Sequence, residues 1–499
     1  MLFLYNHKQS KYLNMKKNFL FLSLFAWMMT IGVHAVDHIG VTSPAYCSEI
    51  QGNTTINIVA PSIYPTINVH CWKQGSGQGT YTLVGTVEMD ENGMGSIVFP
   101  ADEYPHGPLT IRISSKTSRD NKKDCYLQLY NKGGVSWKEG IPSNNPPAAA
   151  GMKLIFADDF DSELSIGSNS SVHTYYDHKP PHGSQDFSFP VRFTDFYSVH
   201  SPFKQVGTYL RIRANANTNT TGLISSFFSD NTGISASVPC YFECRFVGPN
   251  APGSWPAFWL LSKKDNINDN NEPCDELDII EAYGNMSERD KQIYRIAAHP
   301  WSQTGEAEQL IAGFYEGAGK VDPYKFGILS TWFDVPHTYG CKITEDFTIY
   351  YCDDIEVARH ATLPISKSKP LYFLINLATG GGWPVDLSRY NGIIDMYVDY
   401  VRVYEGYESS VSSLDQSGID MKVYPNPVSD QLTVSLNTDA PADVFVSIYN
   451  TLGQRVSSHQ QHQQGEITIP VDMSNMSNGI YMTKVNVGNT QVSKLIIKK

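Results

Sequence analysis

The stretch ELDIIE at residues 276–281 places three acids among three large aliphatic residues, and it decides the architecture of the middle of the chain. Successive side chains of a strand point to opposite faces, so Glu276 and Asp278 share one face while the aliphatic side chains face a core. Glu281 would turn away from that face in a regular strand. One extra residue at Ile279–Ile280, a β-bulge, brings Glu281 back beside the other acids. The stretch therefore predicts a bulged strand that lines one surface with three carboxylates.

Three carboxylates on one surface predict a specific chemistry. Like charges repel unless one group holds a proton, so the pKa of at least one acid is expected to be raised. Retaining glycoside hydrolysis uses this arrangement, because it needs a carboxylate nucleophile and a carboxylic acid proton donor about 5–5.5 Å apart. A solvated acidic strand or a calcium site would carry the same residues, and from the stretch alone these alternatives remain open.

Residues 253–261 (GSWPAFWLL), just upstream, add aromatic side chains to the same region. Trp255 and Trp259 are candidates for walls on which sugar rings stack, because an indole ring offers a flat apolar face. Core packing is the alternative for both rings. From Lys153 to about Glu405, short strand patterns and turn signals alternate without a long amphipathic helix, which predicts one large antiparallel β-sandwich.

Two smaller β domains are expected on either side of this sandwich. Residues 36–145 carry short strands and turns typical of an Ig-like domain, and residues 421–499 carry a second set. Segments 142–150 and 408–420 are linkers by composition. The strands expected in the first domain are Thr55–Ala60, Tyr81–Glu88, Gly95–Phe99, Leu109–Ile113 and Cys125–Tyr130.

The N-terminus predicts export. Lys16 and Lys17 precede an apolar stretch at 19–33, and Val33-His34-Ala35 resembles a cleavage site, so residues 1–35 are expected to be a signal peptide. The apolar stretch is too short for a stable membrane span. The formal net charge of −12 argues against nucleic acid as a partner.

The 8 cysteines show no tight metal-type spacing. Cys240 and Cys244 would share one strand face, too far apart to bridge. A Cys71–Cys125 disulfide is open in an exported protein, and buried free thiols are the alternative.

Several segments resemble glycoside hydrolase family 16, the group that contains laminarinases, agarases and carrageenases. The resemblance is carried by ELDIIE, by the tryptophan run 255–261, and by 370–383 (PLYFLINLATGGGW) and 398–404 (VDYVRVY). Shorter matches lie at 156–160 (FADDF), 222–226 (GLISS) and 241–246 (YFECRF). The resemblance covers residues 151–406 and implies a β-jelly-roll catalytic domain that requires no cofactor. It implies Glu276 as nucleophile, Asp278 as an assisting acid and Glu281 as acid/base.

The same resemblance suggests further site residues. His299 falls where the family has a cleft histidine. Acids at the positions of Asp159 and Asp399 can hold a structural calcium ion in the family, although the family often has a longer Glu where Asp159 stands. The residues expected to contact substrate are Trp255, Trp259, His299, Asn376 and Trp383.

The C-terminal domain resembles the sorting domain of the Bacteroidota type IX secretion system. The matching residues are 423–427 (VYPNP), 449–456 (YNTLGQRV), 479–481 (GIY) and 494–499 (KLIIKK). This resemblance implies the type IX secretion machinery as a partner and a protein that is secreted or reaches the cell surface through the periplasm.

The favoured function is a secreted, endo-acting, retaining hydrolase of β-linked polysaccharide, with β-1,3- or mixed-linked glucan as substrate. An endo-β-galactanase acting on algal galactan or mucin-type glycan is the alternative, as is a non-catalytic glycan-binding protein. The three clustered acids disfavour the binding protein. A lack of basic clusters near the cleft motifs disfavours heavily sulfated galactans, although a single Arg or Lys at one subsite could decide otherwise.

Overall fold

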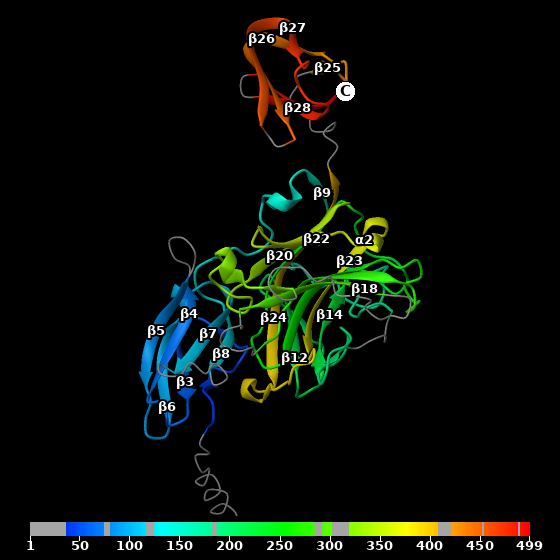
Figure 1. Cartoon of the computed structure of the whole chain (residues 1–499). Helices are drawn as coiled ribbons and strands as arrows, with labels where there is room; N and C mark the ends of the chain where they lie inside the picture. Colours follow the sequence, from blue (N-terminus) through cyan, green and yellow to red (C-terminus); the bar gives the residue numbers. More distant parts are fainter. Residues whose placement is uncertain are drawn as a thin grey trace, which may run out of the picture. The chain divides into compact units, whose positions relative to one another are not determined.

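The computed structural model describes residues 36–73, 80–115, 124–181, 187–284, 292–301, 319–407, 421–451, 454–487 and 490–499. The predicted signal peptide and the predicted linker 408–420 lie outside these ranges. The chain divides into two compact units, Met1–Gly406 and Tyr407–Lys499. Strands make up nearly all of the regular structure (Figure 1), so the predicted all-β class is confirmed.

The central region is a sandwich of two antiparallel-rich sheets. The six-stranded sheet has the order β14 (Leu223–Ser225), β23 (Leu371–Thr379), β16 (Ser254–Ser262), β17 (Cys274–Glu281), β18 (Tyr294–Trp301) and β19 (Lys320–Val321). Eight strands of the ten-stranded sheet follow the order β10 (Arg192–Phe193), β13 (Thr220–Thr221), β12 (Tyr209–Asn215), β24 (Ile393–Tyr407), β15 (Cys240–Val247), β20 (His337–Ile343), β21 (Phe347–Cys352) and β22 (Ile355–Ala361). The other two strands lie off this path: β11 (Phe203–Val206) pairs with β12, and β9 (Met152–Asp158) pairs with β24. Helical segments are short: η1 (Ala101–Glu103), η3 (Pro147–Ala149), η4 (Pro323–Phe326), α2 (Pro364–Ser368) and η5 (Ser388–Tyr390).

Side chains from both sheets meet in one hydrophobic core. Phe258 and Leu277 from the six-stranded sheet are fully buried in the same cluster as Phe242 and Val401 from the ten-stranded sheet. Burial of a large apolar side chain contributes about 1.5–3 kcal/mol. The aliphatic side chains of β17 pack into this core, so the opposite face of the strand can carry polar groups.

The N-terminal β region is packed against the central sandwich rather than tethered to it. The Thr110 hydroxyl donates to the carbonyl oxygen of Phe333 at 2.6 Å, and the Tyr126 ring meets the Phe333 ring edge-on at 5.3 Å. Arg389 donates to the carbonyl oxygen of Asp124 at 2.7 Å. The strands of the N-terminal region form two sheets. The three-stranded sheet has the order β1 (Gly40–Ser43), β3 (Asn53–Val59) and β6 (Met94–Pro100). The five-stranded sheet has the order β2 (Glu49–Ile50), β8 (Cys125–Asn131), β7 (Gly107–Ser115), β4 (Thr66–Lys73) and β5 (Thr80–Glu88).

The segment 142–150, which composition marks as a linker, is also packed. Ala148 and Ala149 are buried beside Tyr404, and the Tyr404 hydroxyl donates to the side-chain oxygen of Asn145 at 3.1 Å. Arg402 donates to the carbonyl oxygen of Asn144 at 3.1 Å. Composition identifies the absence of strands here, but it does not reveal these contacts.

All eight cysteines are free thiols, and seven of them are buried, as the buried-thiol alternative expects, whereas Cys47 is half-buried. The strand register explains why Cys71 and Cys125 do not pair. Cys71 lies opposite Ile111 on β7, whereas Cys125 lies opposite Ile113 of the same strand. The Cys125 thiol is instead 3.0 Å from the Tyr46 hydroxyl.

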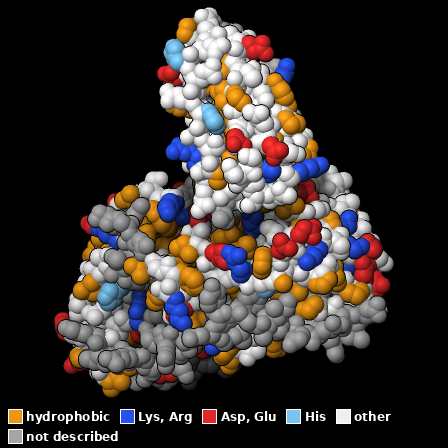
Figure 2. Space-filling model, turned by 45° about the horizontal axis from the view of Figure 1, so that its top comes forward, with side chains coloured by type: hydrophobic (Ala, Val, Ile, Leu, Met, Phe, Trp, Pro, Cys, Tyr) orange, Lys and Arg blue, Asp and Glu red, His pale blue; other side chains and the backbone are white. Residues whose placement is uncertain are grey.

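The C-terminal unit is a separate five-stranded β structure with its own core. Val434, Val446 and Ile469 are buried in that core. Its strands are β25 (Lys422–Tyr424), β26 (Gln431–Asn450), β28 (Gly479–Val487) and β29 (Thr490–Lys498) in that order, with β27 (Arg455–Asp472) on β26. On the face of the molecule in Figure 2, Lys and Arg are interspersed with Asp and Glu. Within the described ranges, no helix is long and apolar enough to cross a membrane.

Candidate active site

The acidic stretch forms β17, and the predicted bulge is present. On the β16 side, Asp278 pairs with Trp259 and Ile280 pairs with Phe258, so Ile279 is the extra residue. The register on the β18 side shifts between Asp278 and Glu281. Ile279 and Ile280 are buried in the core. The extra residue thus returns Glu281 to the polar face of the strand, as the sequence predicts.

Glu276, Asp278 and Glu281 line a single pocket of about 250 Å³. Of the residues expected to contact substrate, Trp255, Trp259 and Asn376 line the same pocket. His299 and Trp383 instead line an adjoining pocket of about 370 Å³ that also includes Glu281. The structure therefore brings all eight predicted catalytic and substrate residues into two pockets that meet at Glu281.

Glu281 is held by two aromatic donors. Its Oε1 accepts a hydrogen bond from Trp255 Nε1 at 2.9 Å and another from the Tyr283 hydroxyl at 3.1 Å. The rings of Trp255 and Tyr283 stack, with centroids 5.6 Å apart. Burial, followed by the negative charge of Asp278, raises the pKa of Glu281 to about 8. Glu281 is therefore protonated at neutral pH and available as an acid.

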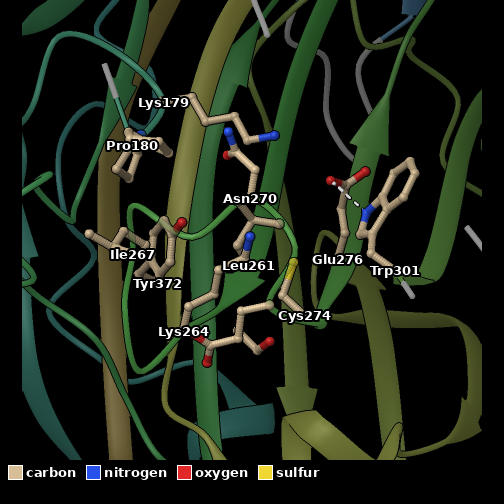
Figure 3. Close-up of a pocket in the computed structure, with 13 residues that line it drawn as sticks. Lys179, Pro180, Leu261, Lys264, Ile267, Asn270, Cys274, Glu276, Trp301 and Tyr372 are labelled. Atoms are coloured by element: carbon tan, nitrogen blue, oxygen red, sulfur yellow. Dashed lines mark hydrogen bonds between the residues drawn. The ribbon is translucent and has the colours of Figure 1, made fainter. Parts of the chain in front are cut away.

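The other two acids have different partners. Glu276 Oε2 accepts a hydrogen bond from Trp301 Nε1 at 3.2 Å (Figure 3). Asp278 is buried, and its Oδ2 lies 3.3 Å from His299 Nε2. Burial, followed by the charge of Glu276, raises the pKa of Asp278 well above its ordinary value. The three acids thus occupy unlike environments, and such differences separate acid and base roles in hydrolases.

Trp259 and Trp383 differ in the exposure of their rings. Trp259 is 5% exposed, and its Nε1 donates to Asn376 Oδ1 at 2.8 Å. Asn376 Nδ2 in turn donates to the carbonyl oxygen of Trp255 at 3.3 Å. Trp383 is 40% exposed. Trp259 therefore serves core packing and the pocket wall together, whereas Trp383 offers an open ring face.

Sequence reasoning missed three residues at the site. Tyr283 and Trp301 each lie two positions after a predicted site residue, Glu281 and His299, and the two-residue repeat of a strand could have indicated them. Lys179 lines the same pocket as the three carboxylates, with its ammonium nitrogen 5.6 Å from the centre of the Trp259 ring. It comes from a loop segment, for which no periodic signal exists.

The carboxylate of Asp399, one of the two residues of the predicted calcium site, already has a cationic partner. The Arg245 guanidinium pairs directly with Asp399 Oδ2, and the Gly140 amide donates to Asp399 Oδ1 at 3.0 Å. A guanidinium at this carboxylate supplies the positive charge that a calcium ion would bring. Among the described residues, the groups of His, Cys, Asp and Glu close enough to hold an ion include neither Asp159 nor Asp399.

Comparison with known proteins gives one match for the C-terminal unit and others for a longer part of the chain. Residues 422–499 match the model of the secretion system C-terminal sorting domain. The C-terminal unit is a sorting domain. This match confirms the expectation drawn from its sequence and indicates export of the chain through a Bacteroidota-type secretion system.

The chain also has relatives among glycanases. The chain is 31% identical over 203 residues to the endo-1,3-1,4-β-glycanase EglC of Rhizobium meliloti, covering 40% of this chain and 37% of that protein. It therefore spans little more than a third of that relative. The laminarinase of Flavobacterium sp. UMI-01 matches 50% of this chain and 100% of its own at 21% identity, with a TM-score of 0.38. A glycoside hydrolase family 16 endo-glucanase from Bacteroides ovatus matches 50% of this chain and 99% of its own at 21% identity, with a TM-score of 0.37. The sequence similarity to EglC supports the expectation of a glycanase domain.

Proposed function

We propose that residues 151–406 are an endo-acting, retaining glycoside hydrolase that cleaves a β-linked glucan. The observation that carries the proposal is the bulged strand β17, which lines one pocket with Glu276, Asp278 and Glu281. The raised pKa of Glu281, about 8, supplies the proton donor that such a reaction needs. Residues 36–145 and 421–499 are the accessory domains of this enzyme.

In the proposed first step, Glu281 donates its proton to the glycosidic oxygen, and the bond from that oxygen to the anomeric carbon breaks. Glu276 attacks the same carbon and forms a glycosyl ester. In the second step, Glu281 removes a proton from water, and the resulting hydroxide replaces Glu276 at the anomeric carbon. Each step inverts the configuration at the anomeric carbon, so the product retains the configuration of the substrate. Glu276 is again a carboxylate and Glu281 again holds a proton.

The neighbouring side chains support these roles. Trp301 holds Glu276 through one carboxylate oxygen, so the other oxygen is available for attack. The buried Asp278 and the half-buried His299 form a polar pair next to the nucleophile. The ring of Trp383 offers an apolar face to a sugar on the Glu281 side, where its pocket lies.

The favoured substrate is a β-1,3- or mixed-linked glucan, because the curated relative is named as an endo-1,3-1,4-β-glycanase. Algal galactan and mucin-type glycan are the alternative substrates. A non-catalytic glycan-binding protein would need no buried proton donor, so the pKa of Glu281 favours an enzyme. The sorting domain supplies the route by which such an enzyme reaches external polysaccharide.

A product screen tests the proposal. Full-length wild type, Glu276→Gln and Glu281→Gln are incubated with laminarin, lichenan, agarose, porphyran, carrageenan and mucin glycans, and oligosaccharides are identified by mass spectrometry. NMR of the first product reports whether its anomeric configuration is retained. We expect oligosaccharides from a β-glucan with wild type alone. The variant Glu356→Gln, on β22 and outside these pockets, serves as the control that retains activity.

Three outcomes would count against the proposal. Turnover that persists in Glu276→Gln removes the nucleophile assignment. A first product of inverted configuration removes the covalent intermediate. If no glycan is cut but one is bound on a glycan array, the chain is a binding protein.

A further inference from the structure

The pocket that Glu281 shares with Trp383 is large enough for a ligand group of its own. Its volume is about 370 Å³, within the range of about 300–1,000 Å³ that small-molecule sites occupy. Glu281 lines this pocket and Glu276 does not. The proton of Glu281 goes to the oxygen that departs with the leaving sugar, whereas Glu276 bonds to the sugar that stays. This pocket, here called the leaving-side pocket, is therefore placed to hold the leaving sugar.

Arg295 brings a cationic side chain to the leaving-side pocket. It lies on β18 directly opposite Glu281 on β17, so the two side chains project from the same face of the sheet. On its other side it pairs with Lys320 of β19, which is a second cation. Neither cross-strand neighbour supplies an ionised carboxylate, because Glu281 holds a proton at neutral pH.

The guanidinium of Arg295 lies over the ring of Tyr283, 5.8 Å from the ring centre. Tyr283 in turn stacks on Trp255, with the ring centres 5.6 Å apart. A cation held over an aromatic face keeps its N–H groups at the edge of the guanidinium plane. Within the described ranges, Arg295 forms no ion pair or hydrogen bond, so these donors remain for a ligand.

We propose that Arg295 binds two adjacent hydroxyl groups of the leaving sugar and selects substrates through them. The proposal rests on the proposed function and assigns a specificity residue to its leaving side. The planar fork of a guanidinium presents parallel N–H donors, and adjacent ring hydroxyls offer acceptor lone pairs side by side. The exposed ring of Trp383 offers an apolar face to the same sugar.

The alternative role for Arg295 is to hold the Tyr283 ring in place and so act through Glu281. The second step of the reaction separates the two roles, because the leaving-side pocket then receives the incoming acceptor. A dinitrophenyl β-glycoside of the glucan cut in the product screen forms the glycosyl-enzyme, and methyl β-glucoside competes with water for it. Mass spectrometry gives the ratio of transfer to hydrolysis. Both acceptors depend on Glu281 as base, so a change in that base alone leaves the ratio nearly unchanged.

The enzymes are full-length wild type, Arg295→Met and Arg295→Lys, with Arg455→Met as the matched control. Arg455 is exposed on β27 of the C-terminal unit. We expect the ratio to fall about tenfold or more in Arg295→Met, because hydrogen bonds from a charged donor are lost. Arg295→Lys keeps the charge without the fork and should give an intermediate ratio. The control should keep the wild-type ratio.

Monodeoxy acceptors identify the hydroxyls that Arg295 binds. Removing such a hydroxyl should lower the ratio in wild type but hardly in Arg295→Met, because the contact is already lost there. Equal effects of every deoxy acceptor in the two enzymes would show that Arg295 contacts none of these hydroxyls.

The failures of the two proposals differ. If wild type hydrolyses the glycoside and Arg295→Met keeps the full transfer ratio, the role of Arg295 is overturned while the hydrolase stands. An unchanged ratio with a shifted pH profile of kcat/KM shows that Arg295 acts through Tyr283 and Glu281 instead. If wild type cuts no substrate, the hydrolase proposal fails. The dissociation constants of glucan oligosaccharides for wild type and Arg295→Met then decide the contact separately, and equal constants overturn it.

Discussion

Replacing Tyr283 with Phe should move the pH dependence of catalysis upward. The Tyr283 hydroxyl donates to Glu281 Oε1 at 3.1 Å and stabilises the charged carboxylate, so its loss raises the pKa of Glu281 from about 8. The reaction needs protonated Glu281, and kcat/KM therefore falls as the pH rises through that pKa. The variant keeps its aromatic ring and with it the stack on Trp255.

The size of the shift follows from the hydrogen bond. A bond to a charged group contributes about 1.5–3 kcal/mol, and about 1.4 kcal/mol corresponds to one pH unit. Trp255 still donates to the same oxygen, and a protonated Glu281 keeps part of the contact, so we take roughly half of the full effect. The falling limb of kcat/KM should move from about pH 8 to about pH 9.

The assay is kcat/KM on a soluble β-glucan, measured from about pH 5 to pH 10, because this profile reports the groups of the free enzyme. Trp383→Phe is the control, since the Trp383 ring lies 6.2 Å from Tyr283 and shares the Glu281 pocket. It should alter KM and leave the limb in place. A limb that stays near pH 8 or moves downward in Tyr283→Phe would refute the assignment of Glu281 as the acid.

Three further predictions concern the site and the fold. Glu281→Ala should lose about 10²–10⁴-fold in kcat on polysaccharide. On an aryl glycoside with a good leaving group, azide should restore the second step of this variant. If azide gives no rescue, the acid/base is another residue. Arg389→Ala removes the 2.7 Å hydrogen bond to the carbonyl oxygen of Asp124 and should lower the free energy of unfolding by about 2 kcal/mol. Urea titration measures this change, and an unchanged midpoint would show that the contact does not hold the N-terminal region in place. A thiol reagent should find eight thiols after denaturation without reductant, and fewer would reveal a disulfide.

The sequence predicts those features that depend on local pattern. The alternation in residues 276–281 predicts a strand, and the five-residue separation of Glu276 and Glu281 predicts its bulge, because only an extra residue reconciles the two. Trp255 and Trp259 followed from their flat rings close to the acids in the sequence, whereas His299 followed from the family resemblance. The five predicted strands of the N-terminal region all exist. β4 was missed, although Ile67, Val69 and Cys71 alternate with polar residues and form its buried face.

Long-range contacts account for what the sequence does not predict. Lys179 and Lys264 are far apart in the chain, and only the folded loops bring both to the pocket beside Glu276. The pairing of Asp399 with Arg245 is similar, because the two residues belong to neighbouring strands that the sequence does not register against each other.

The bulge and the raised pKa of Glu281 have a common cause. In a regular strand, position 281 would face the core, where an ionised carboxylate without a partner is too costly to keep. The extra residue Ile279 instead turns Glu281 to the other face, close to the same core but within reach of Trp255 and Tyr283. There burial raises the pKa of Glu281, so that it holds a proton at neutral pH. The hydrogen bonds from Tyr283 and Trp255 lower that pKa, so that the proton can be donated. A single unpaired residue in β17 thus determines both the direction of this side chain and its acidity, so deleting Ile279 should remove the acid without removing the strand.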